Sequence, residues 1–122
     1  MPNQLASTMT VREIARQAAE AIGVLNDLTH GGGELTSPGE VRDIIASLGL
    51  MGQGLPLLCE HLARFMVTHH EDGQVEHHAG QDPDLSVTEV TEALSAAGQA
   101  ADMMTAALEE AHTASAELRA AR

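Results

Sequence analysis

Lysine, tryptophan and tyrosine are absent from the 122 residues of this chain, and only one aromatic residue, Phe65, is present. Six basic residues face 18 acidic ones, which gives a formal net charge of −12. Binding to nucleic acid depends on basic side chains that neutralise phosphates, and anionic membranes attract cationic proteins in the same way. The composition therefore argues against a nucleic-acid-binding or membrane-surface protein.

Long apolar runs are also missing, because no stretch approaches the roughly 20 apolar residues of a membrane span. No early segment combines a basic start with an apolar run, so we expect a cytoplasmic protein. Cys59 is the single cysteine and has no partner for an internal disulfide. With neither a CxxC motif nor a base nearby in sequence, it is expected to be a small packing residue.

Three helix starts share the capping-box pattern, in which a hydroxyl and a carboxylate three residues later bind amides of the first turn. The pairs are Thr10 with Glu13, Ser37 with Glu40, and Ser86 with Glu89. They predict helices over about 11–29, 38–70 and 87–118, and the glycine run 31–33 ends the first one.

Apolar residues in the two long segments recur at an average step of 3.5 residues, which is the a/d pattern of helices that pack along a narrow seam. The predicted seam of the last segment is Val87, Val90, Leu94, Ala97, Ala101, Met104, Leu108, Ala111, Ser115 and Leu118. That of the second segment is Val41, Ile44, Leu48, Met51, Leu55, Leu58, Leu62, Phe65 and His69. The pattern predicts that these segments pack against other helices.

The second segment carries helix-weakening residues in its middle, namely Gly49, Gly52, Gly54 and Pro56. Proline cannot donate a hydrogen bond to the preceding turn, so the helix is expected to be kinked or broken near residues 49–56. The heptad phase continues across this region, which favours one bent helix. The competing fold has the segment turning back at Gly52–Pro56 to give a compact monomer of four shorter helices.

These elements predict an all-α fold, with an antiparallel helical hairpin and a shorter N-terminal helix packed across part of it as a three-helix bundle. The chain is expected to form a single helical domain, 1–122. Residues 1–9 are predicted to be a flexible N-terminus, and 70–85 a polar, acidic, His-rich connector.

The region around the connector holds the only cluster that resembles a binding site, with His69, His70, His77 and His78 among several carboxylates. Imidazoles brought together by a turn are suitable ligands for Zn, Ni or Cu. The alternative is a hydrated acidic loop, where the carboxylates favour protonated imidazole and oppose metal binding. Catalytic motifs such as GxSxG, HExxH and the P-loop are absent, so no enzyme is expected.

The first helix is too short to cover the whole hairpin, and a continuous apolar strip is rarely left exposed on a soluble monomer. We therefore expect a homodimer through Leu58, Leu62, Phe65, Val87, Val90, Leu94, Ala97 and Ala101. The predicted function is a non-enzymatic helical interaction or structural module that associates with itself or with a protein partner. The alternative is a metal- or pH-responsive binding protein that uses the loop 69–78.

Four features resemble small uncharacterised helical proteins of actinobacterial genomes and mobile elements. They are the run Gly54-Leu-Pro-Leu-Leu, the run Leu62-Ala-Arg-Phe, the loop Gly80-Gln-Asp-Pro and the alanine-rich final segment. The resemblance covers about the last two-thirds of the chain and implies no activity or binding residue.

Overall fold

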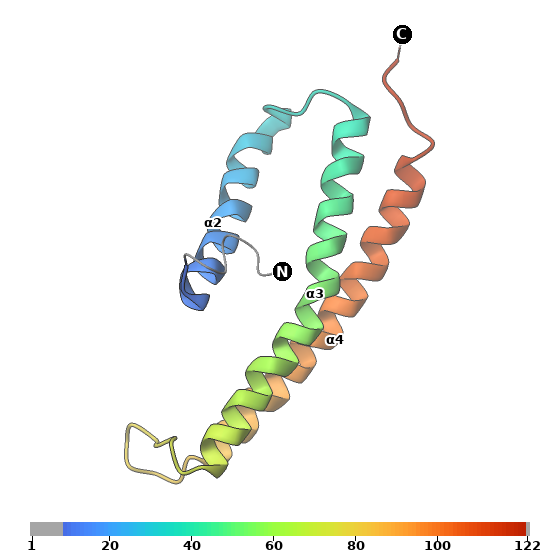
Figure 1. Cartoon of the computed structure of the whole chain (residues 1–122). Helices are drawn as coiled ribbons and strands as arrows, with labels where there is room; N and C mark the ends of the chain where they lie inside the picture. Colours follow the sequence, from blue (N-terminus) through green and yellow to red (C-terminus); the bar gives the residue numbers. More distant parts are fainter. Residues whose placement is uncertain (1–8, 122) are drawn as a thin grey trace. The chain divides into compact units, whose positions relative to one another are not determined.

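The computed structural model describes residues 9–121, which form an all-α structure with no strand among them. The elements are helix α2 (Val11–Thr29), a short 3-10 turn η1 (His30–Gly32), α3 (Pro38–Glu71) and α4 (Asp84–Ser115). Helices α3 and α4 pack side by side as a long antiparallel hairpin (Figure 1). The predicted fold class is confirmed. None of the described helices has the length and apolar character needed to cross a membrane.

The chain consists of two compact units, Met1–Ser37 and Pro38–Arg122. The first contains α2 and η1, and the second contains the hairpin. Packing of the first helix across the hairpin, and a single domain over 1–122, stay predictions. The predicted flexible segment 1–9 lies, except for Met9, outside the described residues.

Helix α2 begins and ends where its sequence signals predict. The Thr10 hydroxyl accepts a hydrogen bond from the Glu13 amide at 3.1 Å, which satisfies a first-turn donor that has no partner inside the helix. Gly31 and Gly32 then adopt φ of 62° and 89°, a left-handed conformation that glycine takes without steric cost. The turn lets the Glu34 amide donate to the Leu28 carbonyl at 2.8 Å, so the capping of both ends follows from local sequence.

Helix α3 is one continuous helix, with Pro56 inside it. Its ribbon changes direction in the middle, as expected where proline removes a hydrogen bond to the preceding turn (Figure 1). The prediction of one bent helix is therefore confirmed, and the fold-back of this segment at Gly52–Pro56 is wrong. The helix ends at Glu71, where Gly73 takes φ of 74° and its amide donates to the His70 carbonyl at 3.0 Å.

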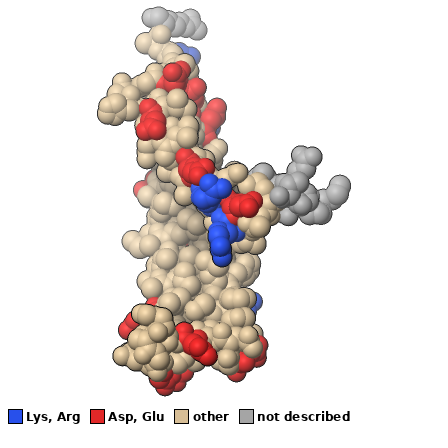
Figure 2. All heavy atoms as spheres, turned by 90° about the vertical axis from the view of Figure 1, so that its left-hand side faces the viewer, with Lys and Arg blue, Asp and Glu red and all other residues tan. Residues whose placement is uncertain are grey.

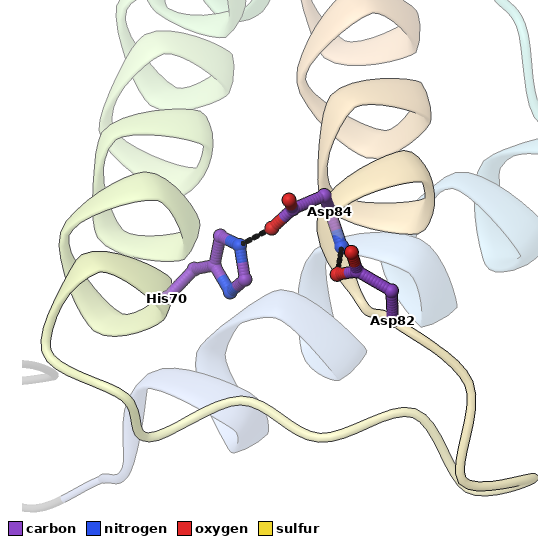
Figure 3. Close-up of polar contacts among 3 residues, drawn as sticks. All are labelled: His70, Asp82 and Asp84. Atoms are coloured by element: carbon purple, nitrogen blue, oxygen red, sulfur yellow. Dashed lines mark hydrogen bonds and ion pairs between the residues drawn. The ribbon is translucent and has the colours of Figure 1, made fainter.

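Helix α4 begins at Asp84, two residues before the predicted cap Ser86. The Asp82 carboxylate accepts a hydrogen bond from the Asp84 amide at 2.9 Å (Figure 3), and the Val87 amide donates to the Pro83 carbonyl at 2.9 Å. The Asp82–Pro83 pair therefore starts the helix before the Ser86–Glu89 box can act. Ser86 lies inside the first turn, and the predicted capping role of Ser86 is wrong.

We expect Asp82→Ala to lower the free energy of unfolding by about 0.5–1.5 kcal/mol, the usual net contribution of one hydrogen bond. Ser86→Ala is the matched control and should change stability by less than about 0.5 kcal/mol, as for other partly exposed sites without a special role. Denaturant unfolding followed by circular dichroism measures both. A larger loss for Ser86→Ala than for Asp82→Ala would contradict the helix start described above.

Helix α4 packs on a stripe of α3 whose positions each lie one residue after a predicted position. The buried and half-buried positions that follow this stripe are Ile45, Gly49, Gly52, Pro56, Cys59, Ala63, Met66 and His70. On α4 they are Val87, Thr91, Leu94, Gly98, Ala101, Thr105, Leu108, His112 and Ser115. Every second predicted position of α4 is correct, and those between them are wrong by one residue, except for Leu118, which lies beyond the end of the helix at Ser115 and is exposed. We call these two stripes the seam.

Close approach of the two backbones explains why small residues occupy the seam. A Cβ atom added to Gly98 would lie 3.5 Å from the Pro56 Cα, and one added to Gly52 would collide with the Thr105 hydroxyl. Thr105 is tolerated there because its hydroxyl donates to the Ala101 carbonyl at 2.9 Å.

The hairpin buries little apolar side-chain surface by itself. Among the described residues only Val87 and Ala101 are buried hydrophobic side chains, each with 6% of its surface exposed. No described side chain of large volume is completely buried. Since burial of apolar surface is the main favourable term in folding, the contact between α3 and α4 contributes only a small part of this term.

Candidate interaction surface

The predicted α3 stripe lies beside the seam and carries many of the large apolar side chains of α3. Ile44 and Leu48 are half-buried, whereas the residues of this stripe from Met51 to Phe65 are exposed. We define the apolar face as this stripe together with its counterpart on α4. Its members are Val41, Ile44, Leu48, Met51, Leu55, Leu58, Leu62 and Phe65 on α3, and Val90, Ala93, Ala97, Ala100, Met104, Ala107, Ala111 and Ala114 on α4.

Helix geometry places both halves of the apolar face on the same side of the hairpin. Each member of the apolar face except Val41 lies one residue before a seam position, and one residue corresponds to a rotation of about 100° about the helix axis. Because the two helices are antiparallel, this rotation brings both stripes to the same side of the hairpin. The opposite side of the hairpin carries the residues that follow the seam positions. There, grooves between the helices are lined by Gln53 with Glu109, and by Glu60 with Asp102. This side carries carboxylates, which the apolar face lacks, together with the exposed Leu50.

Five of the eight predicted interface residues lie on the apolar face: Leu58, Leu62, Phe65, Val90 and Ala97. Phe65 has 60% of its surface exposed.

The other three predicted interface residues, Val87, Leu94 and Ala101, lie in the seam between α3 and α4. They pack inside the hairpin because every second position of the predicted α4 stripe points to α3. The outer row Ala93, Ala100, Ala107 and Ala114 was not among the predicted interface residues. Its signal was present, since these alanines recur at every seventh residue.

Charged side chains avoid the apolar face. Within the described parts of α3 and α4, none of its members is Asp, Glu or Arg. Acidic side chains gather at the connector end of the hairpin, at the bottom of Figure 2, and others lie in the upper half of the view; between them a broad stretch of surface carries no charge in this view. A surface of this kind has no cost of desolvating charges when another apolar surface covers it.

His70 joins the two helices at the connector end. It comes from the last turn of α3, and its Nε2 contacts the Asp84 carboxylate at the first turn of α4 (Figure 3). The imidazole side chain is 24% exposed and its Nδ1 is buried without a hydrogen-bond partner, whereas the Asp84 side chain is 71% exposed. The pair ties the two ends of the connector together, and its exposed carboxylate limits its contribution to at most about 1 kcal/mol.

The other three predicted metal ligands form two groups, His69 with Phe65 and His77 with His78. His69 stacks on Phe65 with ring centroids 4.7 Å apart, and His77 stacks on His78 at 4.9 Å. The His77 Nδ1 accepts a hydrogen bond from the Ala79 amide at 3.1 Å. Both His77 and His78 line a hollow with Val90 at the end of the apolar face. The four imidazoles are therefore not brought together by the turn.

No group of three or more His, Cys, Asp or Glu side chains that could hold a metal ion occurs within residues 9–121. The predicted Zn, Ni or Cu site at His69, His70, His77 and His78 therefore has no ligand geometry in this part of the chain. Calorimetry of tag-free protein is expected to show no saturable zinc binding at micromolar concentration, because the imidazoles have different neighbours. A stoichiometric site that is lost when the four histidines are replaced by alanine would contradict this expectation.

Comparison of the chain with protein-family models, with curated proteins and with solved structures finds no match. The resemblance to actinobacterial helical proteins stays an expectation from sequence.

Proposed function

We propose that this protein is a non-enzymatic helical interaction module whose binding surface is the apolar face of the α3–α4 hairpin. One observation carries the proposal: an uncharged apolar surface follows both helices while the hairpin has almost no core of its own. A contiguous exposed apolar surface with a polar surround is typical of a protein–protein contact.

The energetics support the same proposal. Full burial of one exposed Leu, Met or Phe side chain contributes about 1.5–3 kcal/mol. Leu58, Leu62 and Phe65 each keep close to half or more of their surface exposed, so covering them releases a large part of this free energy. Alanines on α4 let another helix approach closely, as small residues do inside the seam.

Cysteine labelling tests whether the apolar face is covered. In a Cys59→Ala background, Leu58→Cys places a thiol on the apolar face, and Leu57→Cys places one next to it on the other side of α3. Leu58 and Leu57 are similarly exposed in the hairpin, at 47% and 55%. We expect a maleimide reagent to modify the cysteine at 58 more slowly than the cysteine at 57, both in lysate and in purified protein that has associated.

Equal labelling rates at both positions in lysate and in purified protein would overturn the proposed function. So would slow labelling at position 58 in a purified protein that is monomeric, because the face would then be covered by the chain itself. Denatured protein supplies the control, since both thiols must react equally there.

A further inference from the structure

We infer that the apolar face is covered by a second copy of this chain, in a two-fold dimer where α3 of each copy packs on α4 of the other. This inference rests on the proposed function and names its partner. The product is a four-helix bundle built from two hairpins.

Shape complementarity between the two halves of the face supports a second copy. The seam fixes which residues stand at the same level, because Gly52 lies opposite Thr105 and Gly98 opposite Pro56. Counting along both helices from these two contacts shows which residues of the apolar face stand at the same height along the hairpin. Large residues of α3 stand level with alanines of α4. These pairs are Ile44 with Ala111, Leu48 with Ala107, Leu55 with Ala100, Leu58 with Ala97 and Leu62 with Ala93. At two further levels α4 carries a large residue as well, because Met51 is level with Met104 and Phe65 with Val90. The face therefore has a ridge along α3 and, at the other levels, a shallow strip of alanines along α4.

Two-fold symmetry can combine these halves in two ways when the apolar faces meet. An axis parallel to the helices places the ridge of each copy on the alanine strip of the other, and every helix is antiparallel to its neighbours. An axis across the hairpin places ridge on ridge and leaves the two alanine strips facing each other across a gap. Cores favour large residues opposite small ones and avoid voids, so the first arrangement is the one that packs.

Charge favours the same surface for self-association. Each copy has a net charge of −12, so two copies repel each other wherever acidic side chains meet. The described members of the apolar face carry no carboxylate, and the grooves with Glu60, Asp102 and Glu109 lie on the other side. In the proposed dimer the acidic side chains of both copies point away from the contact.

The size of the face is sufficient for a stable dimer. From Val41 to Phe65 it extends over about 36 Å of helix, and two adjacent helices are about 20 Å wide. The product, about 700 Å² per copy, is close to the roughly 800 Å² that each partner buries in a standard stable complex.

Light scattering of tag-free protein at micromolar concentration tests the dimer. We expect a mass twice the 12.8 kDa of one chain. Leu58→Glu should halve this mass, because it places a carboxylate in the contact, whereas the matched control Leu57→Glu should leave it unchanged. Far-UV circular dichroism shows whether each variant remains helical. A monomeric mass for the unchanged chain across a dilution series would overturn the inference.

Cross-linking tests the arrangement without a disruptive substitution. In a Cys59→Ala background, chains with Leu55→Cys are mixed with chains carrying Ala100→Cys and treated with a short bis-maleimide. We expect cross-linked dimers from the mixture and few from either variant alone. Efficient cross-linking of Leu55→Cys chains with each other would show ridge against ridge and overturn the arrangement.

The two proposals fail differently. A monomeric pure protein whose position 58 is protected only in lysate would overturn the dimer and keep the interaction surface for another protein. A dimer in which positions 57 and 58 label at equal rates would overturn the apolar face as the binding surface, and the inferred contact with it.

Discussion

Gly52→Leu is expected to destabilise the hairpin by about 1–3 kcal/mol, the usual cost of adding bulk to a tightly packed contact. The added Cβ would collide with the Thr105 hydroxyl and lie 3.1 Å from the Met104 Cε. The larger side chain fits only if the Thr105 and Met104 side chains shift or α3 and α4 move apart. Denaturant unfolding measures the change in the free energy of unfolding.

Gly54→Leu is the matched control, because it makes the same change two residues away on the same helix. A Cβ at Gly54 meets no atom within 4 Å. The substitution should therefore stabilise the protein by up to about 0.8 kcal/mol, the advantage of leucine over glycine in a helix. If both variants shift stability in the same direction, the close approach of α3 and α4 at Gly52 is wrong.

The second large effect concerns protein concentration. If folding of the hairpin is completed by a second copy, stability depends on how much of that copy is present. A hundredfold increase, from about 1 to 100 μM, should raise the free energy of unfolding by about 2.7 kcal/mol, since each tenfold change contributes about 1.4 kcal/mol. Thermal melts recorded across this range should show a rising midpoint.

Leu62→Glu should remove this dependence, because the variant keeps the seam but loses an apolar contact of the face. It is also expected to melt at a lower temperature than the unchanged chain at every concentration. A midpoint that is constant for the unchanged chain would contradict coupling between folding and association.

Element type and extent were predictable from local sequence, because capping and punctuation act over a few residues. Thr10 and the glycines 31–33 define α2 by hydrogen bonds within one turn. The start of α4 was missed because two overlapping signals compete there. The Asp82 carboxylate binds an amide before Ser86 is reached, and capping patterns alone do not rank such neighbours.

The rotation of α3 could not be predicted from hydrophobicity alone. Leu55, Leu58 and Leu62 make the predicted stripe the most apolar one, yet α4 packs on the adjacent stripe with Gly52 and Pro56. Two heptad stripes one residue apart have the same period, so periodicity identifies the helix but leaves its facing side open. The steric fit between the two backbones determines which stripe of α3 faces α4, and this fit depends on residues of both helices together.

The histidine pairs illustrate a different limit. Sequence shows that four imidazoles lie close along the chain, but the direction of each depends on its secondary structure. His69 and His70 are consecutive residues of α3 and point to Phe65 and Asp84, respectively. Adjacent residues on a helix diverge, and this divergence separates them as ligands.

The two adjacent stripes of α3 also determine which positions are free to vary over evolutionary time. One stripe is restricted by size, as at Gly49 and Gly52, and its neighbour by apolar character, as at Leu58. Together they occupy more than half of the circumference of α3. We expect substitutions among descendants of this chain to accumulate on the remaining strip, which includes Ser47, Gly54 and His61, while α3 as a whole changes slowly.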